Sequence, residues 1–533
     1  MLSKIHNYVK NLLLPCVLFS VVTGFFSAIF VTVFKVLTEY VVKASLFLYD
    51  AVRSEPLYLP LLVIGFAAIG LVASLILSFS HSCRGGGIPT SVAAIRGIVS
   101  FNWVKTIFLL PISALLTFLA GLPLGTEGPC VQMGSAVGDG VVKCFGNERN
   151  KVWRRYIMTG GASAGFSIAT ASPLSAIIFS IEEIHKHFSP ILLSIVSFSV
   201  VSAQITARVL SSFGIGDLSF FHLPEMQALP HTMLYAPVII GLASGISSIC
   251  FTRLYHLSDR LMRLVLKKAS LKIVIPALFA TTAVVGFFFA DAIGSGHSIV
   301  DALFEPGAKW YLLILIFLVR AVGMTVSNTS GATGGVFLPT LAFGAIIGAV
   351  CADAMIALGW IGKEHYILMV VLGVASFLGS TSRIPLTAAV FAIEALSGIS
   401  NVVAIVIAVT VALLAVECSG LEDFTDAVIE AKLHKITKGK KLITIEAPLT
   451  VAEDSFVVGK EIRDILWPNS CVVVSYNPTA HKRETFGIME GDVITVRYVT
   501  YDLDTSVREL TDLVGEQSDH VIRMMHPFVE SDA

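Results

Sequence analysis

The sequence predicts an all-α polytopic membrane protein that carries a small α+β domain at its C-terminus. Of its 533 residues, 14% are charged and 55% are hydrophobic, whereas roughly a quarter of the residues in a soluble domain are charged. Long apolar runs follow one another along most of the chain, and the composition becomes that of a soluble domain from Lys440 onward. These observations exclude a single soluble globular domain.

The apolar runs are long enough to cross a bilayer as helices. Leu12 to Phe34 and Leu57 to Phe79 each exceed the ~20 residues that span a hydrocarbon core. The first run is too long for a signal peptide and has no small-residue cleavage site, so we expect it to be retained. Further runs lie near 104–122, 190–211, 236–251, 272–293, 311–326, 336–359, 366–379 and 401–417.

The charge pattern predicts the orientation in the membrane. The net charge of −1 gives no basic surface for a nucleic acid. Basic residues stand before the first apolar run, in the 149–155 loop and in the 432–441 segment, so we expect both termini and that loop in the cytoplasm. The eight cysteines are scattered without a CxxC pair, which predicts neither a disulfide framework nor a metal site.

Two matches at nearly one offset indicate an internal repeat. PLSAIIFSIE (173–182) returns as PLTAAVFAIE (385–394), 212 residues later. The pattern G-x3-P-x4-G-x3-G begins at Gly125 and again at Gly335, 210 residues later. We therefore expect a membrane domain over 1–436 with homologous halves at about 10–215 and 232–436, and a site where the halves meet at interrupted helices.

Three Gly/Pro-rich breaks interrupt the apolar sequence at Gly85–Pro89, Gly125–Pro129 and Gly334–Pro339. A helix that starts inside a membrane exposes its first N–H groups, which must face protein or water. Those groups and the positive end of the helix dipole form an anion site. Each break alone is more simply a helix–helix turn, but three breaks, two of them repeat-related, favour a shared anion site.

Acidic residues accompany these breaks. Glu127 lies within the second break, and an intramembrane carboxylate is functional by default. It can occupy an anion's place and, once protonated, leave it; the alternative is a helix cap at a water-exposed end. Glu182 and Glu183 end an apolar segment. They are equally well interpreted as a charged helix end at the membrane interface or as residues that transfer protons.

His185 and His187 are two residues apart, so they do not share a helix face for a metal.

These motifs resemble the ClC family of chloride channels and proton-coupled anion exchangers. The family's G-S-G-I-P, G-[KR]-E-G-P and G-x-F-x-P patterns match Gly85–Pro89, Gly125–Pro129 and Gly335–Pro339. The stretch from Gly160 to Phe166, continuing to Glu183, is also similar. The resemblance covers about 10–436 and implies a homodimer of inverted-repeat subunits in a prokaryotic plasma membrane, each subunit with its own pore.

The resemblance also implies roles for individual residues. Glu127 is the gating glutamate, and Glu183 matches the internal proton-transfer glutamate of exchangers, so chloride–proton exchange is the expected activity. We expect a bound chloride or similar small anion and no other cofactor. The anion-binding positions that the resemblance implies are Gly85, Gly86, Gly87, Ile88, Pro89, Gly125, Thr126, Gly128, Pro129, Gly335, Val336, Phe337, Leu338, Pro339 and Thr425.

Three departures from the family pattern bear on this expectation. The family serine of the first motif is Gly86, and the basic residue of the second is Thr126. The family tyrosine of the last membrane helix aligns best with Thr425, with Phe424 as the alternative. Central anion binding and coupling are then weaker than in the family, and the choice between chloride and nitrate stays open. No specific match to fluoride-selective members is present.

The C-terminal segment, 440–533, resembles the TrkA-C domain of ion-transport regulators. Strands are expected at 442–446, 471–476 and 493–497, helices at 459–465 and 506–510, and a turn at Gly491-Asp492. The resemblance implies a cytoplasmic regulatory role with a possible small-molecule ligand. A plain cap or dimer stabiliser is the alternative.

Two rival functions remain. Gly161-Ala-Ser163-Ala-Gly165 spells the G-x-S-x-G elbow of a hydrolase, but its apolar helical context lacks the strand-to-helix turn that the elbow needs. A passive or weakly coupled anion channel on the same scaffold is the nearer rival, against which Glu183 argues mildly.

Overall fold

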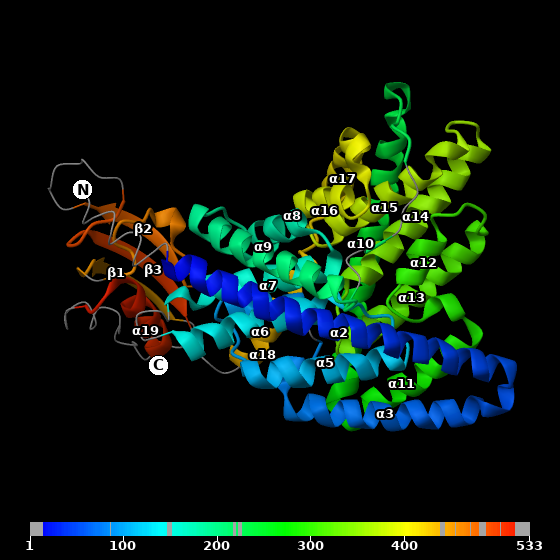
Figure 1. Cartoon of the computed structure of the whole chain (residues 1–533), viewed down its shortest axis with the longest axis horizontal. Helices are drawn as coiled ribbons and strands as arrows, with labels where there is room; N and C mark the ends of the chain where they lie inside the picture. The colour runs from blue at the N-terminus through cyan, green and yellow to red at the C-terminus, as the bar shows by residue number, and fades with distance from the viewer. Residues whose placement is uncertain are drawn as a thin grey trace, which may run out of the picture.

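The computed structural model describes residues 14–85, 87–146, 152–216, 220–221, 226–437, 443–453, 455–468, 471–478, 487–500 and 503–517. Helices build nearly all of it, and a small sheet stands at one end (Figure 1). The predicted fold class, a polytopic helical protein with a small strand-containing C-terminal region, is confirmed.

Helices of the first half follow the predicted apolar runs and breaks. They are α2 (Leu14–Ser54), α3 (Leu59–Phe79), α4 (Ile88–Ile95), α5 (Trp103–Leu119), α6 (Glu127–Phe145), α7 (Arg154–Thr170), α8 (Pro173–Phe179) and α9 (Pro190–Ser212). A short π-helix, η5 (Ser180–His185), follows α8.

The second half repeats this arrangement. Its helices are α10 (Tyr235–Lys268), α11 (Leu271–Phe288), α12 (His297–Ala302), α13 (Trp310–Ser330), α14 (Phe337–Ala357), α15 (Tyr366–Thr381), α16 (Pro385–Glu394), α17 (Val402–Glu417) and α18 (Phe424–Thr437). Within the described ranges nine helical spans are long and apolar enough to cross a membrane, and each overlaps a predicted run.

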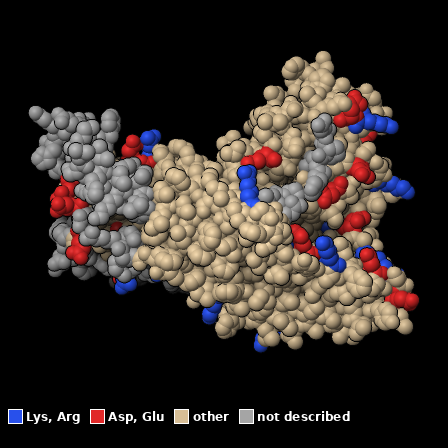
Figure 2. Space-filling view, viewed as in Figure 1, with Lys and Arg blue, Asp and Glu red and all other residues tan. Residues whose placement is uncertain are grey.

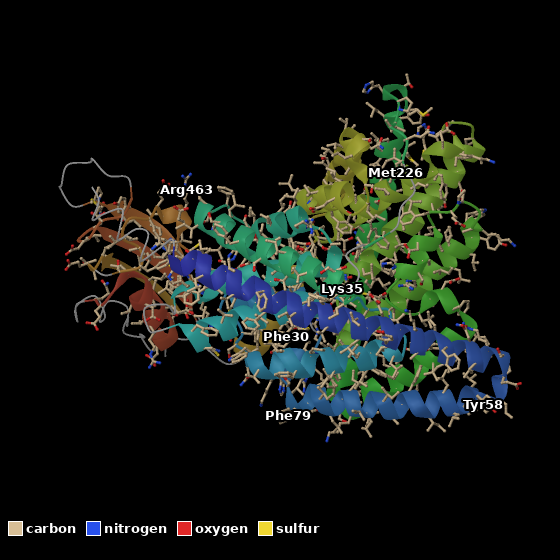
Figure 3. All side chains as sticks on the ribbon, viewed as in Figure 1. Phe30, Lys35, Tyr58, Phe79, Met226 and Arg463 are labelled. Atoms are coloured by element: carbon tan, nitrogen blue, oxygen red, sulfur yellow. The ribbon has the colours of Figure 1, made fainter. Side chains whose placement is uncertain are left out.

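The surface fits a bilayer. Figure 2 shows a broad band of uncharged side chains across the middle of the molecule, with charged side chains mostly toward its ends. Tyr58 and Phe79 mark the two ends of α3 (Figure 3), and this helix exposes Leu61 and Ile64 along its length. Exposed apolar side chains of this size on a long helix are expected where lipid replaces water.

Reciprocal hydrogen bonds join the two halves. The Gly125 amide donates to the Gly335 carbonyl and the Gly335 amide to the Gly125 carbonyl, both at 2.7 Å. A second reciprocal pair involves Glu182 and Glu394, which are related by the repeat. Each hydrogen bond from the first half to the second has a counterpart in the opposite direction, as expected for two halves related by a two-fold axis.

The glutamate pair caps helices across the repeat. The Glu182 carboxylate accepts the amides of Leu386 and Thr387 at the start of α16, at 2.9 and 2.7 Å. The Glu394 carboxylate accepts the amides of Leu174 and Ser175 at the start of α8, both at 3.0 Å. Each carboxylate therefore supplies acceptors to N–H groups that have no intrahelical partner.

Small residues let repeat-related helix pairs pack closely. A Cβ on Gly134 of α6 would lie 2.0 Å from the Gly161 carbonyl oxygen of α7, and one on Gly344 of α14 would lie 2.4 Å from the Gly373 oxygen of α15. Both pairs thus contact through backbone, as small residues permit in membrane helices. This packing fixes the helices whose N-termini form the site.

The three predicted breaks meet in the middle of the membrane part. A Cβ on Gly87 would lie 2.7 Å from the Gly128 Cα, and a Cβ on Gly128 would lie 2.7 Å from the Gly335 Cα. Only residues without a side chain fit at these contacts. The starts of α4, α6 and α14 therefore converge on one junction, which we call the glycine junction (Gly87, Gly128, Gly335).

The C-terminal region contains an antiparallel sheet of order β1-β3-β2. Its strands are β1 (Ile443–Thr450), β2 (Cys471–Asn477) and β3 (Val493–Thr500), and α19 (Leu503–Val514) follows them. All three predicted strands, the predicted 506–510 helix and the turn at Gly491 are confirmed, although β1, β3 and α19 extend beyond the predicted ends.

The helix predicted at 459–465 is wrong. Only a 3₁₀ turn forms there, η10 (Ile462–Asp464). Gly459 has a φ of +77°, and its amide donates to the Ile488 carbonyl at 2.8 Å, while the Ile488 amide donates to the Lys460 carbonyl at 2.9 Å. Because this backbone pairs with a distant segment, it cannot make helical bonds.

The C-terminal region is attached to the start of α7. The Tyr156 hydroxyl donates to the Asp464 carbonyl at 2.7 Å and accepts the Leu466 amide at 2.8 Å. Arg155 forms an ion pair with Glu509 of α19 at 2.9 Å. Because α7 also packs against α6, the C-terminal region is connected through two helices to the glycine junction.

The first prediction concerns the caps between the halves. Glu394→Ala removes the acceptor from two N–H groups and should lower the free energy of unfolding by about 1–2 kcal/mol. Glu182→Ala should cost more, because Glu182 also accepts the Thr387 hydroxyl at 2.7 Å. The midpoint of thermal unfolding in detergent measures both changes. If Glu394→Ala behaves like Glu430→Ala, a change at an exposed carboxylate of α18, the cap contributes nothing.

The second prediction concerns the glycine junction. Gly128→Ala places a methyl group against the backbone of both Gly335 and Gly87, and should destabilise the protein by at least about 2 kcal/mol because backbone cannot move aside easily. Gly65→Ala is the matched control, since an added Cβ there meets no atom within 4 Å. Equal thermal stability of the two variants would contradict the close contact at the junction.

Candidate functional site

Two facing helix starts present amide groups at the glycine junction. The first helical bond of α6 runs from the Cys130 amide to the Thr126 carbonyl, and that of α14 from the Thr340 amide to the Val336 carbonyl, both at 3.1 Å. The amides of 126–128 and of 336–338 therefore precede the helical ladders. The positive ends of both helix dipoles point to the same place, which favours an anion.

The start of α4 differs from the other two. The Gly87 amide donates to Gln132 Oε1 of α6 at 2.8 Å, and Gln132 Nε2 donates to the Ser82 carbonyl at 2.7 Å. Gln132 is fully buried. The first amide of α4 thus already has a partner, so α4 supports the junction more than it offers a donor there.

Glu127 lies between the starts of α6 and α14. Its side chain is fully buried, and Oε1 accepts the Thr126 hydroxyl at 3.1 Å. The carboxylate lies close to Leu338 in the first turn of α14, because a Cβ on Gly125 would lie 2.5 Å from Glu127 Oε2 and 3.0 Å from Leu338 Cβ. Oε2 has no hydrogen-bond partner among the described residues. A carboxylate of one half therefore occupies the amide-rich helix end of the other half.

A cavity of about 200 Å³ reaches the junction. Arg84 in its wall brings a positive charge, and its Nε donates to the Leu77 carbonyl at 2.8 Å. The Tyr255 hydroxyl of α10 donates to Asn328 Oδ1 at 2.9 Å. The predicted site residues that line this cavity are Gly85, Ile88, Pro89, Gly128, Gly335 and Val336.

The other predicted positions are not part of this lining. Gly86 lies outside the described residues. Phe337 is buried, and its ring packs against Phe166 and Phe391 with centroids 5.1 and 5.6 Å away. Buried or half-buried around the junction, but not in the cavity wall, are Gly87, Gly125, Thr126, Glu127, Pro129, Leu338 and Pro339. The cavity therefore stops short of Glu127.

The structure places Phe424, and not Thr425, in the cavity wall. The Phe424 ring lies 4.5 Å from that of Tyr255. The Thr425 amide donates to Asp423 Oδ1 at 3.1 Å, and its side chain lies beside Glu183. This placement differs from the expected one because the first turn of α18 directs consecutive side chains to different neighbours.

Glu183 belongs to a second acidic cluster, on the side of the C-terminal region. It is buried in η5, and its Oε2 has no partner. Lys186 donates to Asp423 at 2.9 Å and to Asp426 at 2.5 Å, while Arg96 donates to the Glu183 carbonyl at 3.3 Å. Burial raises the pKa of Asp423 above its ordinary value, and Lys186 offsets this only in part.

Several residues of these sites were not predicted from the sequence. Arg84 directly precedes the first break, and Lys186 directly follows the glutamate segment, so their positions along the chain could have indicated them. Asp423 precedes the predicted last membrane helix. Gln132 carries no sequence signal, because an amide in an apolar helix has many possible partners.

The hydrolase interpretation loses its geometric basis. Ser163 lies inside α7 and is fully buried, whereas a nucleophile elbow needs a turn between strand and helix.

The described part of the chain contains no cluster of three His, Cys, Asp or Glu side chains that could hold a metal. His185 Nε2 lies 2.8 Å from the Thr159 hydroxyl, and all eight cysteines are free thiols.

Known proteins resemble this chain in sequence and in fold. An H(+)/Cl(-) exchange transporter of Klebsiella pneumoniae, ClcA, is 26% identical over 385 residues, which cover 70% of this chain and 80% of the relative. The structure of a slow cyanobacterial Cl-/H+ antiporter matches with a TM-score of 0.72 at 22% identity, over 79% of this chain and 98% of that one. A CLC-type fluoride/proton antiporter matches with a TM-score of 0.60 at 22% identity, over 75% and 95%.

The sequence model of one family, described as voltage gated chloride channel, covers residues 68–417. This range contains both repeat-related breaks, the glycine junction and Glu183. It ends before α18 and the C-terminal sheet. The chain is a multi-span integral membrane protein and belongs to the voltage-gated chloride channel (ClC) family.

Proposed function

We propose that this protein exchanges chloride, or a similar small anion, for protons across its membrane, with Glu127 as gate and Glu183 as internal proton carrier. The observation that carries the proposal is the position of the buried Glu127 carboxylate at the start of α14, next to Leu338. Relatives that bear the name of an H(+)/Cl(-) exchanger support it.

The anion branch follows from the helix starts. A chloride ion in contact with the amides of 126–128 and 336–338 would receive partial positive charge without meeting a full cation. The Glu127 carboxylate competes for the same amides. Protonation removes its charge, so the side chain leaves the amides and an anion takes its place. The Glu127 side chain therefore either carries a proton or occupies the amides that bind the anion, and this exclusion couples the proton flux to the anion flux.

The proton branch would start at Glu183. This carboxyl is buried near the C-terminal side of the membrane part. The half-exposed Lys186, three residues further along the chain, pairs with Asp423 and Asp426. An ionisable group at such a position is costly unless it is used. Protons would pass from the Asp423–Lys186 pair to Glu183, and from there to Glu127 by way of water.

A weakly coupled transporter, or a passive channel, is the second candidate. Phe424 in the cavity wall brings no hydroxyl to the anion, and the first motif has Gly86 in place of serine. Both features weaken binding in the centre of the pathway, and an anion that binds weakly competes less well with Glu127. Full exchange and loose coupling differ in the number of protons moved per anion, which the assay below measures.

Orientation, assembly and regulation complete the proposal. We place the C-terminal region and both termini in the cytoplasm of a prokaryotic cell, as the basic loops favour. We expect a homodimer, as the family resemblance implies. The C-terminal region would act as a TrkA-C-like regulator through its contacts with α7.

Purified protein in proteoliposomes tests the function. Under an imposed chloride gradient, external pH and chloride are recorded together, and nitrate and fluoride replace chloride in parallel experiments. An exchanger moves protons against their gradient. Anion flux with no proton movement would show that the channel alternative is correct.

The third prediction concerns the gate. Glu127→Ala removes the carboxylate that competes with the anion, so chloride flux should persist while proton movement falls to the background of empty liposomes. Glu127→Gln, which resembles the protonated form, should give the same result. Proton coupling that survives in both variants would remove Glu127 from the mechanism.

The fourth prediction concerns the proton branch. Glu183→Gln keeps the size of the side chain and loses its ability to carry a proton, so proton movement should fall at least tenfold while chloride flux remains within about twofold of wild type. Glu430→Gln serves as a control at an exposed carboxylate. Equal losses of both fluxes in Glu183→Gln would indicate a structural role instead.

A further inference from the structure

Helix α12 holds a histidine on the far side of Glu127 from the C-terminal region. Figure 1 shows α12 at the end of the molecule away from the sheet. The helix begins 209 residues after α4 (88 to 297), which makes it the repeat counterpart of α4. As Gly87 packs against α6, Gly296 packs against α14, where a Cβ would lie 2.8 Å from Ala342 Cβ.

A buried arginine fixes the loop that leads into α12. Arg320 of α13 donates to the carbonyls of Asp291, Ile293 and Gly294 at 3.0, 2.9 and 2.9 Å. Gly296, with a φ of +102°, leaves no room for a side chain beside this guanidinium. His297, the first residue of α12, is therefore held in a defined position.

Both ring nitrogens of His297 face acceptors. Nε2 lies 2.7 Å from the Phe220 carbonyl oxygen, and Nδ1 lies 2.9 Å from Asp301 Oδ2. A neutral imidazole has a single N–H and would leave one of these acceptors facing a lone pair, whereas the imidazolium donates to both. The geometry thus favours the charged ring.

The start of α14 brings the ring close to Glu127. Gly296, the residue before His297, packs against Ala342, which lies one turn after Leu338 on α14. A Cβ on Gly125 would lie 3.0 Å from Leu338 Cβ and 2.5 Å from Glu127 Oε2.

Among the described residues, Asp301 on its own helix also faces the ring, while Arg320 of α13 lies beside the preceding residue, Gly296. Burial lowers the pKa of His297, but Asp301, the Phe220 carbonyl and Glu127 together outweigh burial, so the pKa lies above its ordinary value. The side chain is 42% exposed.

We propose that His297, held by Asp301 and the Phe220 carbonyl, is a positioning residue for the gate: its positive charge stabilises the Glu127 carboxylate and sets the pH at which Glu127 takes up a proton. The neighbour of Glu127 in its own half, Thr126, is uncharged, and His297 supplies a cation from the other half. This inference rests on the proposed role of Glu127 as gate.

The proposal has a definite sign. A nearby cation favours the ionised carboxylate, so Glu127 protonates at lower pH in its presence. Because protonation releases the gate, chloride flux should rise on acidification of the α12 side, with a midpoint that Glu127 sets. Loss of the His297 charge should move that midpoint to higher pH by about 0.5–1 unit, the size expected for a partly screened charge.

The fifth prediction tests this with chloride flux in oriented proteoliposomes as a function of pH on the α12 side. His297→Gln retains hydrogen bonding without charge and should shift the midpoint upward. His297→Lys retains the charge and should stay within about 0.2 units of wild type, a small fraction of the shift expected from the full charge. Asp301→Asn, which weakens the hold on the imidazolium, should shift the midpoint in the same direction as His297→Gln but less.

A control in the Glu127→Ala background, together with the pH response of wild type, distinguishes failure of this inference from failure of the proposed function. In the Glu127→Ala background, His297→Gln should leave the pH profile flat. If wild type shows no Glu127-dependent pH response at all, the role of Glu127 is wrong. If wild type responds, but His297→Gln keeps its midpoint or shifts together with His297→Lys, the His297 proposal is overturned.

Discussion

The backbone pairing of Gly125 with Gly335 is the contact on which the rest of the site depends. It brings the N-termini of α6 and α14 together inside a low-dielectric region, where two positive dipole ends repel each other. Such a junction requires a negative charge for stability. The Glu127 carboxylate meets this requirement in the structure. In the mechanism that we propose, an anion meets it when Glu127 is protonated, so the alternation between the two follows from how the halves are joined.

The scaffold is close to two-fold symmetric, but the chemistry depends on its differences. Glu182 and Glu394 occupy equivalent positions and perform equivalent capping. Glu127, in contrast, corresponds to Phe337 at an offset of 210, and Glu183 corresponds to Ala395 at an offset of 212. The first half thus supplies both acids, while the second half supplies the amides that one of them contacts. A symmetric pair of acids at the junction would repel each other and disfavour the ionised gate.

Most of the fold could be predicted from the sequence. The bilayer thickness sets the length of the apolar run that each membrane helix needs, and the repeat is visible as a constant spacing between matching motifs. The glycine junction was also predictable, since clustered glycine and proline break an apolar helix and mark where backbone must face protein or water. The Gly87–Gln132 bond could not be predicted, and the choice between Phe424 and Thr425 could not be made, because both depend on which way a side chain points in one turn of a helix. The 459–465 segment failed for a related reason: its pairing with Ile488 is a contact between distant segments, which local pattern does not reveal.

In the pathway that we propose, Arg84 and His297 bring positive charges to either side of the glycine junction. Arg84 lies in the wall of the cavity that leads to the junction, and His297 lies beyond Glu127. Between them the available donors are backbone amides, which attract an anion less strongly than a guanidinium or an ammonium group. A permeant ion must bind firmly enough to enter and weakly enough to leave, so cations at the entrances can raise the local anion concentration while amides in the middle keep release fast.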